Sequence, residues 1–569
     1  MHYFKNDRRM TKSVYQTFPK KSMIYSSEEI DRGNFGGYNP PESVFTAEKT
    51  MESHQALTEK VILQSFKGFP IHLLKIYPRS FSFLNGLMFG LVRTPEGRKL
   101  TVMGDRGTVL ADPFRGDILS GTSSLKTCDL SQENTDCLMA RFPFTRPKSV
   151  LTYPVTLGTG DRLGVATPGH VRAIRPFKAR PVFAQQSVRE NTQTGRNFKE
   201  VIRDAAWAVF QENYREGYGA DGDHLKSLRE IEEALDAGVS MVTLDLSEKL
   251  NPQAFDGPID VINRTYRDQI GEEESKVLFH LFLDKEFHLQ GTRGECRIRY
   301  DEESVKRNAL IYHKALDFTE EVYEFIRSRK GNQGAIDFEV SIDETPFPTS
   351  PESHLFFLIE LNHRGVRFNS LAPRFIGEFQ KGIDYRGDVR VFREQFSRHA
   401  IIAQHYGNYK LSVHSGSDKF SVFPDIGNLA KDGFHLKTAG TSWLEAMRLI
   451  ALKAPALFRD MHQVALSSFG EATKLYHVTT DLGRIPNLSG LQDRDLPPLL
   501  DQVDPRQLLH ITYGFLLNAK DRDGKTLFRD RFYQTLADYE EDYWTLLEKH
   551  IQKHLTSLNV EKGEGSCQA

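Results

Sequence analysis

Charged and polar residues end a series of short apolar segments between residues 150 and 445. In such places carboxylates can transfer protons, imidazoles can bind a divalent metal, and Lys, Arg, Ser or Gln can hold a polar substrate. Clustering so many charged groups costs free energy unless they pair with one another or bind a ligand. We therefore expect a functional site formed by a subset of these residues: Asp161, Gln185, Asp223, His224, Asp245, Glu339, Arg374, His414, Ser415, Asp418, Lys419, His435 and Lys437.

Three histidines of this set, His224, His414 and His435, follow three different apolar segments. Neutral imidazole nitrogens suit borderline divalent metals such as Zn, Mn, Ni or Co. A single histidine is equally well explained as a hydrogen-bonded core residue. Because the three would meet at one rim if the segments are neighbouring strands, we expect them to share one divalent cation.

Two carboxylates are the candidates for proton transfer. Asp223 precedes a histidine in GYGADGDH, and Glu339 lies within FEVSIDE, where alternation places it on the face opposite Phe338 and Val340. Partial burial of a carboxylate at a barrel mouth raises its pKa toward the range useful for catalysis. The alternative for either residue is a structural salt bridge with an arginine.

The remaining polar residues are candidates for substrate binding. The segments HSGSDK (414–419) and KTAGTS (437–442) are rich in small residues, which let backbone amides approach an anion. Lysine or arginine side chains nearby would complement a carboxylate equally well, whereas ordinary tight turns are the alternative. The predicted substrate-binding residues are Asp161, Gln185, Asp245, Arg374, Ser415, Asp418, Lys419 and Lys437. Asp161 and Asp245 are also alternative candidates for proton transfer.

The elements that must position these residues are short strands that alternate with helical segments. The expected strands are 153–160, 180–187, 217–224, 239–247, 335–343, 366–375, 409–418 and 433–442. Near-continuous apolar strands separated by helices indicate a parallel sheet, and a count of eight favours a closed (β/α)₈ TIM-type barrel. In such a barrel, catalytic residues lie at the carboxyl ends of the strands.

The barrel is expected over 150–460 in this chain of 569 residues, with a helical insertion at 248–332. An N-terminal arm at 1–54, a small β-rich or mixed region at 55–149 and a helical extension at 461–569 complete the chain. A net charge of −2 gives no sign of a nucleic-acid partner. No apolar run is long enough to span a membrane, and no secretory signal is evident, so we expect a cytoplasmic protein.

Several long phrases in the barrel region resemble the tagaturonate/fructuronate epimerase family of hexuronate catabolism. These include FEVSIDETPFPTSPESHLFFLIELNHRGVRFNSLAPRFIGEFQKGIDYRGD, YKLSVHSGSDKFSVFP and FHLKTAGTSWLEAMRLIA, preceded in order by GTGDRLGVATPGH, FAQQSVREN and GYGADGDHLK. The resemblance covers residues 150–460. It implies a metal-dependent isomerase that acts on a keto-hexuronate, with its acid/base pair and metal ligands in the DGDH, FEVSIDE, LSVHSGSD and GFHLK segments.

Such a reaction inverts a carbon that lies β to the ketone, so simple enolisation cannot explain it. The two routes are transient oxidation by a nicotinamide cofactor and retro-aldol cleavage followed by re-addition. Because no strand-linked GxGxxG motif is present, we expect no NAD and favour the retro-aldol route. The alternatives are a metal-dependent aldolase or another sugar isomerase on the same barrel, and a non-catalytic sugar-acid binding protein. The sequence leaves a homo-oligomer open.

Overall fold

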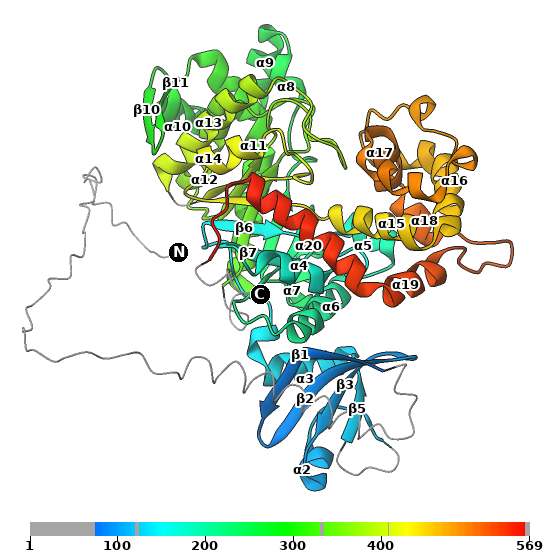
Figure 1. Ribbon diagram of the computed structural model, residues 1–569. Coiled ribbons are helices and arrows are strands. Elements are labelled where there is room, and N and C mark those ends of the chain that lie inside the picture. Colours follow the sequence, from blue (N-terminus) through cyan, green and yellow to red (C-terminus); the bar gives the residue numbers. More distant parts are fainter. Residues whose placement is uncertain (1–73, 120–124, 330–334, 408, 564–569) are drawn as a thin grey trace, which may run out of the picture. The chain divides into compact units, whose positions relative to one another are not determined.

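The computed structural model of the protein describes residues 74–119, 125–329, 335–407 and 409–563 (Figure 1). The arm expected at 1–54 and the start of the β-rich region expected at 55–149 lie outside these residues. Within the described chain, no helix has the length and apolar character needed to cross a membrane.

Eight parallel strands close into a barrel, which confirms the predicted (β/α)₈ fold. The last strand pairs with the first, with His435 opposite Thr156, and the fourth pairs with the fifth, with Thr243 opposite Glu339. The strands, shorter than expected in most cases, are β6 (Val155–Gly158), β7 (Arg180–Ser187), β8 (Gly219–Leu225), β9 (Met241–Asp245), β12 (Asp337–Ile342), β13 (Ser370–Pro373), β14 (Lys410–Val413) and β15 (Phe434–Lys437).

Helices surround these strands and bury the outer faces of the barrel. In β12 all six residues are buried, but Phe338, Val340 and Ile342 belong to the apolar core, whereas Glu339 alternates with them. The principal helices of this layer are α4 (Thr167–Ile174), α6 (Phe198–Gln211), α7 (Leu228–Ala237), α11 (Glu302–Arg329), α12 (Pro351–His363), α13 (Val389–Tyr406), α14 (Phe423–Leu429) and α15 (Thr441–Lys453). The alternation directs polar side chains into the barrel interior.

The insertion after the fourth strand differs from the purely helical segment that we expected. It contains α8 (Gln253–Asp256), α9 (Ile259–Gln269) and α10 (Glu272–Phe282), and then an antiparallel hairpin of β10 (Glu286–Gly291) and β11 (Gly294–Arg299). In the hairpin, Leu289 pairs with Cys296, and both are buried while their neighbours are exposed. This period of two is the signal of a half-buried hairpin.

A five-stranded antiparallel sheet precedes the barrel, in the order β1-β2-β3-β5-β4. Its strands are β1 (Lys75–Leu84), β2 (Leu87–Thr94), β3 (Gly97–Met103), β4 (Asp117–Ile118) and β5 (Leu125–Asp129). The sheet shares an apolar core with the C-terminal helices, and the Tyr77 hydroxyl donates a hydrogen bond to Glu540 at 2.9 Å.

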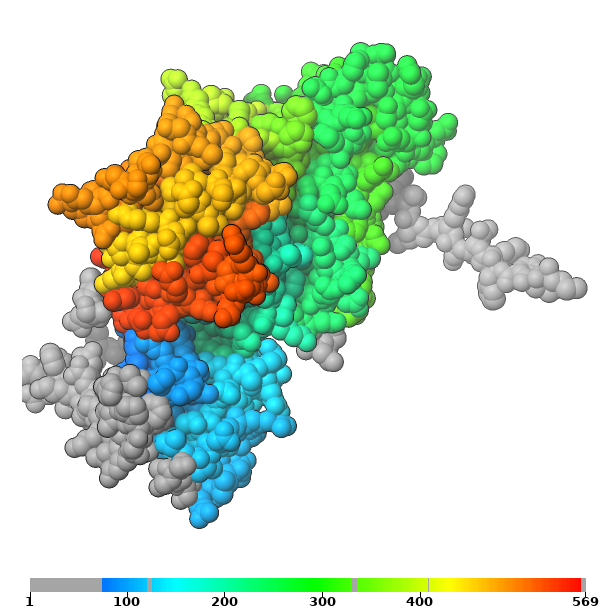
Figure 2. Space-filling model, turned by 90° about the vertical axis from the view of Figure 1, so that its right-hand side faces the viewer, coloured from blue at the N-terminus to red at the C-terminus, as the bar shows by residue number. Residues whose placement is uncertain are grey.

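The C-terminal extension is helical, as expected. It contains α16 (Pro455–Ala472), α17 (Val503–Ile511), α18 (Tyr513–Asn518), α19 (Arg529–Asp538) and α20 (Glu540–Ser557). The last helix packs against α4 and α15. Figure 2 shows the orange and red residues of this region beside the yellow residues of the last part of the barrel.

Candidate active site

A polar cavity opens at the carboxyl ends of the barrel strands. Its lining includes six of the residues expected there: Gln185, Asp223, His224, His414, Ser415 and Lys437. A second, wider groove adjoins it and shares His414 and Ser415. The cavity is therefore in the place where a TIM-type barrel carries its chemistry.

Lys437 is the centre of a buried network of carboxylates inside the barrel. Its Nζ lies 2.9 Å from Asp221 Oδ2, 2.6 Å from Asp223 Oδ1 and 2.8 Å from Glu339 Oε1, and it donates to the Thr243 hydroxyl at 2.7 Å. These residues come from β15, β8, β12 and β9. The side chain that we expected to bind substrate is thus held by three acidic groups.

The network shifts the pKa values of its carboxyl groups in opposite directions. Burial raises the pKa of Asp221 to about 7, although the ammonium group of Lys437 opposes the shift. For Asp223 and Glu339, burial acts in the same direction, but Lys437 and the neighbouring histidines prevail and lower the pKa of each. The site therefore holds two ionised carboxylates and one carboxyl group that can carry a proton near neutral pH.

Asp221 was missed by the sequence analysis. It lies two residues before Asp223 on β8, so the two share a face of the strand. The glycine-rich character of this segment obscured the alternation that would have identified it.

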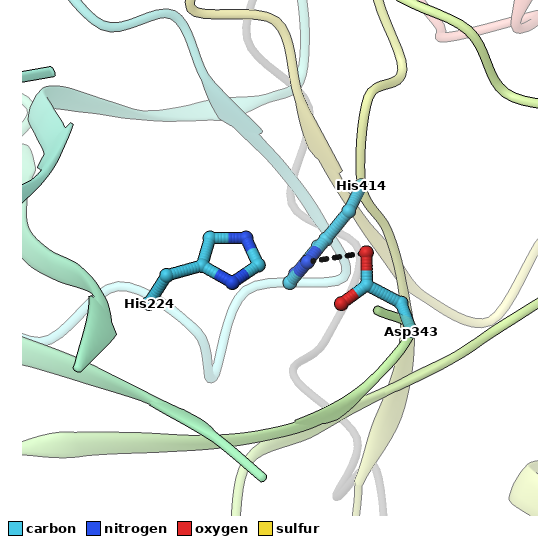
Figure 3. A group of neighbouring side chains, drawn as sticks. All are labelled: His224, Asp343 and His414. Carbon is cyan, nitrogen blue, oxygen red and sulfur yellow. Dashed lines mark ion pairs between the residues drawn. The ribbon is translucent and has the colours of Figure 1, made fainter. Parts of the chain in front are cut away.

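Two histidines meet over the mouth of the barrel. The rings of His224 and His414 have their centroids 4.9 Å apart, and Asp343 lies beside His414, with Oδ2 3.3 Å from Nδ1 (Figure 3). His224 ends β8 with a φ of 53°, a left-handed conformation that costs a non-glycine residue roughly 1–3 kcal/mol. Each of the three residues offers one ligand atom within 4.8 Å of the others.

Both imidazoles have one nitrogen held by a carboxylate. His224 Nδ1 lies 3.1 Å from Asp245 Oδ2, and His414 Nε2 lies 2.8 Å from Glu339 Oε1. This arrangement is typical of metal-binding histidines, because the outer carboxylate orients the ring and leaves the other nitrogen free for the cation. Asp245, expected to touch the substrate, instead orients a histidine.

His435 does not join the other two histidines. Its Nδ1 forms a hydrogen bond with the Thr156 hydroxyl at 2.8 Å, and the side chain is fully buried on β15, two residues before Lys437. Burial lowers its pKa to about 3. A residue within the strand faces a deeper layer of the barrel than one at its end. In the described chain Asp343, and not His435, lies beside His224 and His414.

Three of the predicted substrate-binding residues support loops instead. The Asp161 carboxylate accepts hydrogen bonds from four backbone amides of the loop that follows it. Asp418 pairs with Arg506 at 2.7 Å and with His550 at 2.6 Å, and Lys419 donates to three backbone carbonyl groups. None of the three lines the cavity within the described chain.

Gln185 and Arg374 occupy different depths of the site. Gln185 lines the cavity and donates from Nε2 to Asp223 at 3.1 Å; Gly158 makes room for it, since a Cβ there would lie 2.2 Å from Gln185 Oε1. Arg374 lines the adjoining groove and donates to the backbone carbonyl of Thr345.

The sequence analysis also missed a cationic part of the cavity. Its lining includes Arg162, Arg189 and Lys381, and His510 from α17. Arg162 follows the first expected strand, where its position could be anticipated. Lys381 comes from a loop and His510 from the C-terminal extension, where no strand end marks them, so no pattern in the sequence places these two at the site.

Comparisons with known proteins identify the family of the chain. A family model described as tagaturonate epimerase matches residues 77–558. A tagaturonate/fructuronate epimerase of Thermotoga maritima is 38% identical over 500 residues, which cover 88% of this chain and all of that protein.

Solved structures give the same result. The native crystal structure of the fructuronate-tagaturonate epimerase UxaE of Cohnella laeviribosi is 45% identical, with a TM-score of 0.82, and the match covers 89% of this chain and 100% of that one. A structure of that enzyme with one glycerol is 44% identical, with the same TM-score, over 90% of this chain and 100% of the other.

Proposed function

The chain belongs to the tagaturonate epimerase family, and we propose that it interconverts D-tagaturonate and D-fructuronate by metal-assisted retro-aldol cleavage and re-addition. The observation that carries the proposal is the grouping of His224, Asp343 and His414 next to the carboxylates around Lys437, at the cavity and its adjoining groove.

The position of the inverted carbon restricts the chemistry. If the ketone is numbered C2, the two sugar acids differ at C4, whose hydrogen is not acidified by the carbonyl group. Cleavage of the C3–C4 bond turns C4 into an aldehyde and leaves an enediolate on C1–C3. Rotation of the aldehyde about C4–C5 and re-addition of C3 to its other face then invert C4, and its hydrogen stays on carbon throughout.

The residues at the mouth of the barrel fit a divalent cation. Two imidazoles and a carboxylate are common ligands of Zn and similar metals, and buried His414 Nδ1 faces Asp343 Oδ2 at 3.3 Å, where a cation could lie between the two. Three carboxylates surround Lys437, and Asp245 and Asp343 lie beside the two histidines, so a cation bound there would add to the positive charge that balances them. When bound, the metal would act as a Lewis acid that stabilises the enediolate charge.

Asp223 is the group best placed to remove the proton of the C4 hydroxyl. It lines the cavity, and Lys437 keeps it ionised. Lys437 lines the cavity as well and can return a proton to the new alkoxide. The proton held by Asp223 can then pass to Lys437 across their 2.6 Å contact, which restores both groups.

Glu339, which we expected to share this work, is better suited to positioning. It is fully buried, and its two oxygens accept hydrogen bonds or ion pairs from His414, Lys437 and Ser370. It therefore acts on the substrate through these neighbours.

The proposal is tested by incubating the purified protein and Mn²⁺ with D-tagaturonate and following the products by proton NMR. D-fructuronate should appear, and EDTA should abolish its formation until a divalent metal is restored. Free three-carbon fragments in place of D-fructuronate would favour the aldolase alternative, and full activity in EDTA with no metal in the protein would contradict the metal assignment.

A further inference from the structure

Several buried polar atoms in the cationic part of the cavity have no partner in the described chain. They are Nη1 of Arg162 and both ring nitrogens of His510, whose residues are 2% and 3% exposed. The ammonium group of Lys381, which lines the same cavity, forms no ion pair or hydrogen bond with a described residue. Unpaired donors at this depth are costly unless a ligand satisfies them.

The charges in this part of the cavity do not balance. Arg162, Arg189 and Lys381 line it together with only two neighbouring carboxylates, Glu190 and Glu344, which leaves one surplus positive charge. Asp223 and Lys437, which pair with each other, line the same cavity and leave this surplus unchanged. A ligand with one negative charge would neutralise it.

Arg162 and His510 are held in place by the fold. Arg162 donates from Nε to Glu190 at 2.9 Å and stacks 4.2 Å from the ring of Tyr513, so only Nη1 is left for a ligand. His510 reaches the cavity from α17 between two glycines, since a Cβ on Gly440 would lie 2.1 Å from its Nε2 and one on Gly382 would lie 3.1 Å from its Nδ1. Burial and the nearby cations lower the pKa of His510, so the ring is neutral and one of its nitrogens is a hydrogen-bond donor.

We propose that Arg162, Lys381 and His510 bind the terminal carboxylate of the sugar acid, and that the C-terminal extension thereby completes the substrate site. This inference rests on the proposed function, because it assigns the end of the substrate that distinguishes a keto-hexuronate from a neutral ketose. It replaces the earlier expectation for Lys419 and Lys437, whose ammonium groups are already held by three carbonyl groups and three carboxylates.

The assignment fits the reaction geometry. Rotation about C4–C5 moves the aldehyde but leaves the carboxylate at C6 in place. An anchor at C6 would therefore keep the aldehyde fragment in the cavity while its two faces exchange, which is what an epimerase needs and an aldolase does not.

The first test measures kcat/KM for D-tagaturonate and for D-tagatose, which carries a hydroxymethyl group in place of the carboxylate. Lys381→Met should lower kcat/KM for D-tagaturonate by about 10²-fold, mainly through KM. The decrease of kcat/KM for D-tagatose should be at least tenfold smaller, because a charge-assisted contact is lost only with the acid. Lys474→Met removes an exposed lysine and should leave the ratio of the two values unchanged. Equal losses for both sugars would overturn the proposal.

The second test measures binding without turnover, by calorimetry with L-galactonate, which shares the C3–C5 configuration and the C6 carboxylate of D-tagaturonate, and with galactitol. The wild-type protein should prefer the acid by at least tenfold, and Lys381→Met should remove most of this preference. His510→Asn, a change in a different element, should reduce it about tenfold and serves if the first variant does not fold. A wild-type protein without the preference would overturn the subsite, whereas the preference without epimerisation of D-tagaturonate would retain the subsite and refute the proposed function.

Discussion

Replacing Lys437 by methionine removes the ammonium group that joins three buried carboxylates and keeps a side chain of similar length. At an effective dielectric constant of about 20, a pair of charges 2.8 Å apart, as for Lys437 and Glu339, attracts by ~6 kcal/mol. The cost of burying the charges cancels part of this attraction, and removal of one partner from a buried pair costs ~3–5 kcal/mol. We therefore expect Lys437→Met to lower the free energy of unfolding by that amount.

A second substitution shows whether the loss comes from uncompensated charge. Asp221→Asn in the Lys437→Met background removes the carboxyl group for which ionisation is least favourable, since burial raises its pKa to about 7. It should restore roughly 1–3 kcal/mol, although the same change in the wild-type protein should not stabilise it.

The assay is urea denaturation followed by tryptophan fluorescence in EDTA, because a bound cation would compensate for the missing lysine. Lys474→Met, which removes an exposed charge, should change the stability by less than about 0.5 kcal/mol. The reasoning is refuted if Lys437→Met is as stable as the wild-type protein, or if the two substitutions destabilise additively.

Four further outcomes are expected. Asp245→Asn should weaken metal affinity by about 10–100-fold in a chelator competition assay, because the carboxylate orients His224; unchanged affinity would contradict its positioning role. Asp223→Asn should lower kcat by about 10²–10⁴-fold. The wild-type reaction in D₂O should leave no deuterium at C4, and deuterium found at C4 would refute the retro-aldol route. Lys381→Met should release measurable free dihydroxyacetone during turnover, and complete retention would argue against an anchoring role for the carboxylate. Burial raises the pKa of Glu360 from 4.5 to about 7, so the folded state binds the proton more tightly than the unfolded state and the free energy of unfolding falls as pH rises through this interval. Glu360→Gln should remove this decline and add ~1–3 kcal/mol to the free energy of unfolding at pH 8. Urea midpoints of the wild-type protein that do not change with pH would contradict the prediction.

The sequence by itself determined the barrel and the level at which the site lies. The eight apolar segments are recognisable because a strand covered by helices must be apolar on its outer face, as Phe338 and Val340 are on β12. Parallel strands bring their carboxyl ends to one rim, so Asp223, His224 and His414 could be placed together from their positions in the chain alone.

Within a strand, the sequence determined which residues share a face but not their depth in the barrel. His435 and Lys437 lie on the same face of β15, and only the closed barrel shows that the first belongs to a deeper layer. For the same reason Asp343, which follows β12 in a loop, could not be distinguished from an ordinary surface carboxylate until the structure placed it beside His414.

Only the tertiary structure decided which charged residues are available to a substrate. Asp161, Asp418 and Lys419 have the residue types expected of binding groups, but each is occupied by backbone groups or by side chains from distant segments. Lys381 and His510 come from a long loop and from the C-terminal extension, and no local pattern marks them. Whether a charged group is paired depends on contacts between residues far apart in the chain, and such contacts leave no periodic signal in the sequence.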